Sequence, residues 1–234
     1  MAVATVGMLM LRWRIAPRMT REPELTKLIL TRHGHVEGIH PERFRGRIEL
    51  ALTELGLRQA QRTAAYIAEN WTPAIVYSSP LQRCRTTAEE IARACGGIEL
   101  VVTDALHDLD YGAWQWRTHE AVKEADPERF DLWRSSPHLV RFPEGEALQD
   151  LVARTADALR LALDRHPAQT VVFVGHDSVN RALLLQLLDQ PLSAYWRLTQ
   201  DPCGISEVDV EAGGVKARRI NEIGHLRACE PART

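Results

Sequence analysis

Short apolar runs alternate along the chain with longer amphipathic stretches. The apolar runs are rich in Val, Ile and Leu, as buried β-strands are, and they read LILT, AIVYSS, IELVVT and TVVFVGH in chain order. The longer stretches carry apolar residues at helical spacing and read LTELGLRQAQRTAAYIAEN, PLQRCRTTAEEIARA, GEALQDLVARTADALRLALDRH and SVNRALLLQLLD. The pattern therefore predicts strands and helices in alternation.

Individual residues support the prediction of the first two helices. In the first, the apolar residues Leu57, Ala60, Ala64 and Ile67 recur at helical spacing, which predicts a helix. The second stretch begins with Pro80, a residue suited to the first turn of a helix. We expect both helices to pack against strands.

The order of the elements predicts the fold class. Alternating strands and helices predict an α/β fold with three layers, in which a mainly parallel sheet carries helices on both faces. The last segment, ISEVDVEAGGVKARRINEIG, predicts two strands joined by a turn at Gly213 and Gly214. Residues 107–145 are polar, aromatic and less regular than their flanks, so we expect an irregular insertion over the carboxyl edge of the sheet.

Length and composition fit one globular domain. The chain has 234 residues, of which 45% are hydrophobic and 26% charged, enough for a single core. We expect a loosely ordered N-terminal extension over residues 1–26, a single domain over 27–226 and a tail over 227–234. Arg12 and Arg14 interrupt the apolar stretch near the N-terminus, so we expect no signal peptide and no membrane anchor.

The net charge and the cysteines indicate which binding partners and which cellular compartment to expect. A net charge of -2 and a pI near 6.5 give no overall basic field for nucleic acid or an anionic membrane, so any anion binding must be local. The cysteines are scattered without metal-ligand spacing, which fits reduced thiols in a cytoplasmic protein. They are Cys84, Cys95, Cys203 and Cys229.

Polar residues stand at the ends of three predicted strands. Arg32 and His33 follow the first, Ser78 and Ser79 end the second, and His176 follows TVVFVG. Because the carboxyl ends of parallel strands meet at one edge of a sheet, we expect these side chains to converge.

Arg83 adds a second cation to this edge. It lies in the first turn of the helix after Ser79, from where its guanidinium group can fold back over the strand ends. Guanidinium groups bind phosphate oxygens bidentately and imidazoles add single donors. Two arginines and two histidines in one crevice therefore describe a site for a tetrahedral anion.

Motifs in the same order make this chain resemble the histidine phosphatase superfamily, also called the phosphoglycerate mutase-like family. TRHG is similar to the family's defining Arg-His-Gly segment, and FRGRIELALTELGLRQA keeps the family's spacing to the next helix. SSPLQRCRTTAEEIA resembles the segment with the second phosphate arginine, LHDLDYGAWQW the segment with the proton donor, and VGHDSVNRALL the segment with the second histidine. The resemblance covers about residues 27–226, including the insertion 107–145, and implies a phosphoglycerate mutase-like fold with one catalytic domain.

The resemblance also implies a role for each charged residue. His33 would be the nucleophile that forms a phosphohistidine, with the neighbouring cations keeping its nitrogen unprotonated. Arg32, Arg83 and His176 would hold the phosphoryl oxygens and stabilise their charge in the transition state. No metal or other cofactor is expected.

The proton donor departs from the family's pattern. Asp108 stands where the family usually has Glu, and its shorter arm moves the acid by about one methylene. Asp110 is the alternative donor. Asp177 stands beside His176 where the family often has Gly, and its charge would repel phosphate unless it points away or orients a ring.

Two phosphate contacts common in the family are missing after the Arg-His-Gly segment. Val36 and Ile39 stand where a polar Ser or Thr and an Asn are common. We expect Arg43 or Arg45 to substitute for them in substrate binding.

These features predict a metal-independent phosphomonoester hydrolase that acts on a small phosphorylated metabolite and binds neither nucleic acid nor membrane. Mutases of the family usually carry longer insertions and a C-terminal tail, so a phosphatase is favoured over a cofactor-dependent phosphoglycerate mutase-type phosphotransferase. A non-catalytic phosphate-ligand sensor is the third alternative. The identity of the metabolite and the oligomeric state stay open, with a homodimer among the alternatives.

Overall fold

The computed structural model describes residues 25–229. The expected N-terminal extension therefore lies almost wholly outside the described residues, as do residues 230–234 of the expected tail. Within the described range, no helix has the length and apolar character needed to cross a bilayer.

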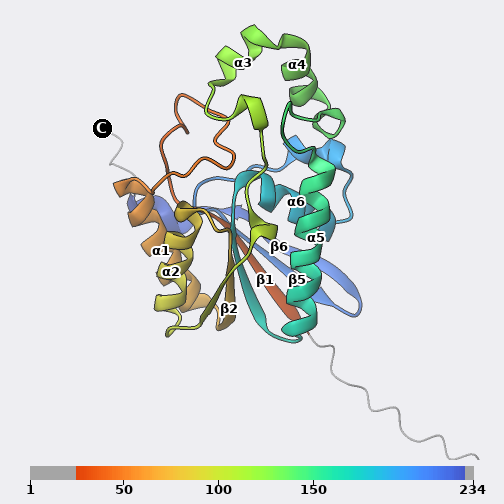
Figure 1. Cartoon of the computed structure of the whole chain (residues 1–234). Helices are drawn as coiled ribbons and strands as arrows, with labels where there is room; N and C mark the ends of the chain where they lie inside the picture. The colour runs from red at the N-terminus through yellow and green to blue at the C-terminus, as the bar shows by residue number, and fades with distance from the viewer. Residues whose placement is uncertain (1–24, 230–234) are drawn as a thin grey trace, which may run out of the picture.

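A six-stranded sheet forms the middle layer of the molecule (Figure 1). Its strands are β1 (Thr26–Arg32), β2 (Pro73–Ser78), β3 (Glu99–Val102), β4 (Thr170–Gly175), β5 (Ile205–Glu211) and β6 (Gly214–Glu222). They lie in the order β3-β2-β4-β1-β5-β6. The first four pair in parallel, and β5 and β6 are antiparallel to their neighbours. The predictions of a mainly parallel sheet and a C-terminal hairpin are confirmed.

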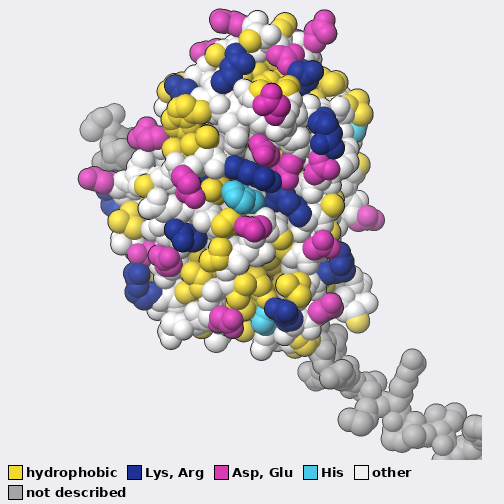
Figure 2. Space-filling model, in the orientation of Figure 1, with side chains coloured by type: hydrophobic (Ala, Val, Ile, Leu, Met, Phe, Trp, Pro, Cys, Tyr) yellow, Lys and Arg dark blue, Asp and Glu magenta, His cyan; other side chains and the backbone are white. Residues whose placement is uncertain are grey.

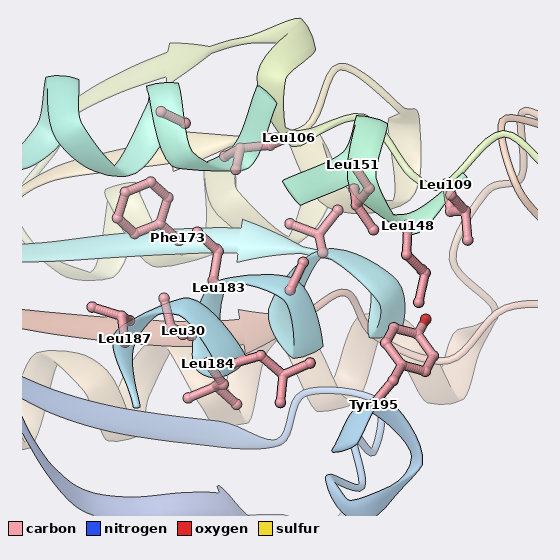
Figure 3. Packing of buried hydrophobic residues seen from close by; sticks show 14 of the residues in the cluster. Leu30, Leu106, Leu109, Leu148, Leu151, Phe173, Leu183, Leu184, Leu187 and Tyr195 are labelled. Atoms are coloured by element: carbon pink, nitrogen blue, oxygen red, sulfur yellow. The ribbon is translucent and has the colours of Figure 1, made fainter. Parts of the chain in front are cut away.

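Helices cover both faces of the sheet, to either side of the strands in Figure 1. They are α1 (Glu54–Asn70), α2 (Gln82–Ala94), α5 (Leu148–Arg165) and α6 (Asp177–Leu187). Side chains of α1 and α2 pack on one face with Ile29 and Val172. Those of α5 and α6 pack on the other with Leu30 and Phe173 (Figure 3). Because successive strand residues point to opposite faces and both faces are covered, the strands read as continuous apolar runs.

The insertion is more regular than the sequence predicted. It contains two short helices, α3 (His119–Ala125) and α4 (Pro127–Ser135), which lie beyond the carboxyl ends of the strands (Figure 1). Thr118 caps α3 by accepting a hydrogen bond from the Ala121 amide. The side chain of Trp133, on α4, is buried in the core beside α5 and α6.

Short 3-10 helices complete the described chain. They are η1 (Asp104–Leu106), η2 (Gly112–Trp114), η3 (Pro137–Leu139), η4 (Leu192–Arg197) and η5 (Gly224–Cys229). The last of these packs against α1 with Leu226 and Cys229 buried, so the described part of the expected tail is attached to the domain.

The start of α2 differs from the prediction. Pro80 lies ahead of the helix, which begins at Gln82. The amide of Ser79 still donates to the Val174 carbonyl of β4, at 3.1 Å. The chain is therefore held along the neighbouring strand as far as Ser79, and Pro80 turns the chain before the helix begins.

The first turn of α1 lies against the loop that follows β1. A Cβ atom on Gly56 would lie 2.1 Å from the His35 carbonyl oxygen, and one on Gly34 would lie 2.3 Å from the Gly56 carbonyl oxygen. The amide of Thr53 donates to the His35 carbonyl at 3.0 Å. Because Gly56 occupies the inner side of this turn, Leu57 faces outward and is 39% exposed, so it does not share the buried face of Ala60, Ala64 and Ile67.

We expect Gly56→Ala to lower the free energy of unfolding by about 1–3 kcal/mol, because a methyl group pressed against backbone forces the loop to shift. Gly213→Ala is the matched control, since a Cβ atom there meets nothing within 4 Å, and it should change stability by less than about 0.5 kcal/mol. Urea unfolding measures both variants. Equal stabilities would contradict the close approach.

Candidate active site

The pairing of β1 with β4 brings two histidines to one point of the sheet edge. Arg32 lies opposite Gly175, and the amide of His33 donates to the Gly175 carbonyl at 3.0 Å. His176, the next residue along, is the N-cap of α6. The ring centroids of His33 and His176 are 5.2 Å apart, and each residue is only 1% exposed.

The contacts of His33 define which ring nitrogen is free. Nδ1 lies 2.7 Å from the carbonyl oxygen of Gly34. A carbonyl oxygen can only accept, so Nδ1 carries the proton and Nε2 keeps its lone pair. Burial lowers the pKa of His33 well below the usual value, and the charges of Arg83 and Arg32 lower it further. The ring is therefore neutral at physiological pH.

Two buried arginines lie near His33, close enough for their charges to lower its pKa, and of the two Arg32 lines the pocket whereas Arg83 does not. Arg32 donates through Nη1 to the Gln200 carbonyl at 2.6 Å. Arg83 donates to the carbonyls of Ile48 and Gly46, each at 2.7 Å. The Nε groups of both arginines are buried and have no hydrogen-bond partner among the described residues. Buried donors are nearly always paired, so these two N–H groups suit an oxygen-rich ligand.

Asp108 lies between Arg83 and His176. Its Oδ2 atom is 3.2 Å from Arg83 Nη2 and 3.4 Å from His176 Nδ1. Its Oδ1 atom accepts from the hydroxyl group of Ser178 and, at 2.9 Å, from the amide of Leu109. The structure thus places a carboxyl group beside the histidines and arginines.

Asp110, the alternative donor, lies apart from this cluster. Its Oδ1 atom accepts from the Gly112 amide at 2.9 Å, and its Oδ2 atom is 3.6 Å from Arg47 Nη1. Asp108 and His33 line one pocket, and Asp110 does not line it.

The pocket has a charged and aromatic rim. Arg43 and Arg45 line it, but both are already hydrogen-bonded, Arg43 to the Trp116 carbonyl at 2.6 Å and Arg45 to the Gly38 carbonyl at 2.7 Å. Five aromatic side chains also line the pocket, namely Phe44, Tyr111, Trp133, Tyr195 and Trp196. Basic, acidic and histidine side chains gather near the middle of the face drawn in Figure 2.

Asp177 also lines the pocket, where a free negative charge would repel an anion. Its carboxylate pairs with Arg181 one helical turn later. Arg181 in turn donates to the Tyr195 carbonyl at 2.9 Å. The charge of Asp177 is therefore matched by a cation on the same helix.

Two polar residues of this region were missed by the sequence analysis. Ser178 lies within the motif VGHDSVNRALL, and its hydroxyl group next to His176 was the available signal. Arg154 donates to the Asp108 carbonyl at 3.0 Å from α5, and nothing in the sequence separates it from the solvated residues of that helix. Within residues 25–229, no group of three or more His, Cys, Asp or Glu residues could hold a metal ion.

Comparison with known proteins gives a match over most of the chain. The sequence model described as "Histidine phosphatase superfamily (branch 1)" matches residues 28–223. The chain is 34% identical over 202 residues to "Phosphoserine phosphatase 1" of Hydrogenobacter thermophilus, covering 86% of this chain and 95% of that protein. It is 33% identical over 167 residues to "Metal-independent phosphoserine phosphatase" of Arabidopsis thaliana, covering 71% and 70%.

A solved structure is similar as well. A phosphoserine phosphatase mutant from Entamoeba histolytica, in complex with phosphoserine, superposes with a TM-score of 0.76 at 25% identity, covering 86% of this chain and 99% of that one. Other relatives are longer proteins, and the matched region is 55% of the length of three mycobacterial ones.

The buried neutral histidines predict a pH-dependent stability. The pKa values of His33 and His176 lie well below the usual value of 6.5, chiefly because of burial. As the pH falls below about 6.5 the unfolded chain takes up protons at these rings and the folded chain does not, so stability is lost over that range, by up to about 1.4 kcal/mol per pH unit for each ring. Urea unfolding from pH 7.5 to 5.5 should show a smaller loss in His33→Asn than in the parent. Identical pH dependences would contradict a buried neutral His33.

Proposed function

The chain belongs to the histidine phosphatase superfamily (branch 1), and from this premise we propose that it hydrolyses a small phosphomonoester through a phosphohistidine on His33. The observation that carries the proposal is a pair of buried histidines at 5.2 Å, near two buried arginines whose charges lower the pKa of both rings and whose Nε donors lack a partner among the described residues. The proposed catalytic domain spans residues 27–226, including the insertion 107–145. A cytoplasmic location is part of the proposal, supported by the free cysteines.

His33 is the proposed nucleophile. Its Nδ1 proton is held by the Gly34 carbonyl, so the Nε2 lone pair is available for in-line attack on phosphorus. A bond forms between Nε2 and phosphorus as the bond from phosphorus to the ester oxygen breaks. The phosphohistidine divides one difficult transfer into two easier ones.

Arg32, Arg83 and His176 are the proposed ligands of the phosphoryl oxygens. Both arginines keep a buried Nε donor without a partner among the described residues, and the buried His176 ring lies beside that of His33. Fixed donors in a water-poor site stabilise charge on the equatorial oxygens without reorganising during the reaction. No metal ion is needed for this step, in agreement with the name of the plant relative.

Asp108 is the proposed proton donor. In the first step its carboxylic acid gives a proton to the departing alkoxide oxygen. In the second, its carboxylate takes a proton from the water that attacks the phosphohistidine, which releases phosphate and restores His33. Asp110 is not proposed for this role because it is engaged with Gly112 and Arg47.

Phosphoserine is the proposed class of substrate. Relatives at 34% and 33% identity are named for it. The rim of the pocket carries both kinds of group that its amino-acid end requires. Arg43 and Arg45 can meet a carboxylate, and Glu42 can meet an ammonium group. Sugar phosphates offer neither charge.

We expect His33→Ala to lose phosphatase activity on para-nitrophenyl phosphate by at least about a thousandfold, while the parent stays active in EDTA. Release of phosphate measures both. Cys95→Ala, a partly buried residue away from the pocket, is the control. An active His33→Ala variant would rule out His33 as the nucleophile.

The parent enzyme also tests the two alternative functions. Binding of phosphoserine without turnover would favour the non-catalytic sensor, and stimulation of activity by a bisphosphoglycerate would favour the mutase.

Substitution of Asp108 and of Asp110, the two candidate proton donors, should affect kcat/KM differently. Asp108→Asn should lower kcat/KM for phosphoserine by about 10²–10⁴-fold, the usual worth of a general acid, and Asp110→Asn by much less. The loss in Asp108→Asn should be small for para-nitrophenyl phosphate, because nitrophenolate leaves without a proton. If Asp110→Asn shows that selective loss instead, the donor is wrongly assigned.

A further inference from the structure

The segment that carries Asp108 lacks regular structure of its own. Residues 107–111 lie between η1 and η2 and belong to no helix or strand. The carbonyls of His107 and Asp108 are therefore not paired within a helix or a sheet. Asp108 has a short side chain, so the position of this backbone decides where its carboxyl group can reach.

Arg154 supplies the missing hydrogen bonds. From α5 its Nη1 atom donates to the carbonyls of Ala105 and His107, at 3.1 and 2.5 Å. Its Nη2 atom donates to the carbonyl of Asp108 itself, at 3.0 Å. One guanidinium group thus holds two carbonyls of the segment and one of η1 just before it, and Arg47 adds a longer hydrogen bond to the Asp108 carbonyl, at 3.3 Å.

Glu146 holds Arg154 in place. Its two oxygens accept from Nε and Nη2 of Arg154, at 3.1 and 2.9 Å, and it also accepts from the Asp110 amide at 3.0 Å and from Arg47 at 2.8 Å. Burial would raise the pKa of Glu146, but the hydrogen bonds from Arg154 and Asp110 outweigh it, and the pKa is lowered. The carboxylate is therefore charged and ties both ends of the segment to α5.

Arg154 does not line the pocket. Its hydrogen bonds run to the backbone of Asp108 and of the residues before it, whereas only its charge reaches His176. A variant that keeps the charge therefore separates the two routes. We propose that Arg154, fixed by Glu146, is the positioning residue of the proton donor and sets the backbone of residues 105–108 so that the Asp108 carboxyl group meets the leaving oxygen. This inference rests on the proposed function. Small misplacements of a reacting group are costly, and Asp in place of Glu leaves less reach to compensate for them.

The test uses the leaving group as the probe. The first irreversible step determines kcat/KM, and its need for a proton grows with the basicity of the leaving oxygen. We compare kcat/KM for phosphoserine with kcat/KM for para-nitrophenyl phosphate. The ratio of the two is independent of the fraction of enzyme that is folded, so partial misfolding of a variant does not affect it.

Arg154→Met should lower this ratio by about tenfold or more, in the same direction as Asp108→Asn. Arg154→Lys should lower it less, since an ammonium group keeps the charge but cannot span three carbonyls. In an Asp108→Asn background, Arg154→Met should leave the ratio unchanged, because the two residues act as one unit. Arg160→Met is the matched control, an exposed arginine of the same helix paired with Asp157, and should leave the ratio as in the parent.

The outcomes distinguish a failure of the proposed function from a failure of the positioning role of Arg154. An inactive parent overturns the proposed function and this inference with it. An active parent in which Asp108→Asn lowers the ratio and Arg154→Met does not overturns this inference alone. It is also overturned if Arg154→Met still lowers the ratio once Asp108 is replaced.

Discussion

The parallel pairing of β1 with β4 is the constraint on which the site depends. Arg32 lies opposite Gly175, and the His33 amide is bonded to the Gly175 carbonyl, so both strands end at the same level. Because side chains alternate along a strand, a shift of one residue would turn His33 to the other side of the sheet. Gly175 leaves room for α6 to begin at once, since a Cβ atom there would lie 3.0 Å from side-chain atoms of Val179 and Asn180. The helix start then fixes His176.

Burial of these side chains prepares the site to bind an anion. Arg32 and Arg83 donate to backbone carbonyls, and burial lowers the pKa of both histidines. The carboxyl group of Asp108 is in direct contact with Arg83, whereas the charge of Asp177 is matched by Arg181. A phosphate dianion can therefore enter a site whose cations are fixed before it arrives. This is the condition under which electrostatic stabilisation costs no reorganisation.

The sequence predicted the parts of the fold that depend on local pattern. Continuous apolar runs gave the strands, and residues at strand ends gave Arg32, His33 and His176. The missed features depend on tertiary contacts. Leu57 faces outward because Gly56 lies against the His35 carbonyl. The contacts of Arg154 run to backbone carbonyls of a segment more than forty residues earlier, and carbonyls carry no residue identity that a sequence pattern could reveal. The helices α3 and α4 are too short for a clear period.

The central claim is that phosphate passes through His33 in two in-line steps, and the stereochemical course at phosphorus tests it most directly. A phosphorothioate monoester can be made chiral at phosphorus with two oxygen isotopes and hydrolysed by the enzyme in water that carries the third. Each in-line displacement inverts the configuration, so two displacements through a phosphohistidine predict thiophosphate with overall retention. Inversion would mean that water attacks the substrate directly, and it would contradict a covalent intermediate on His33.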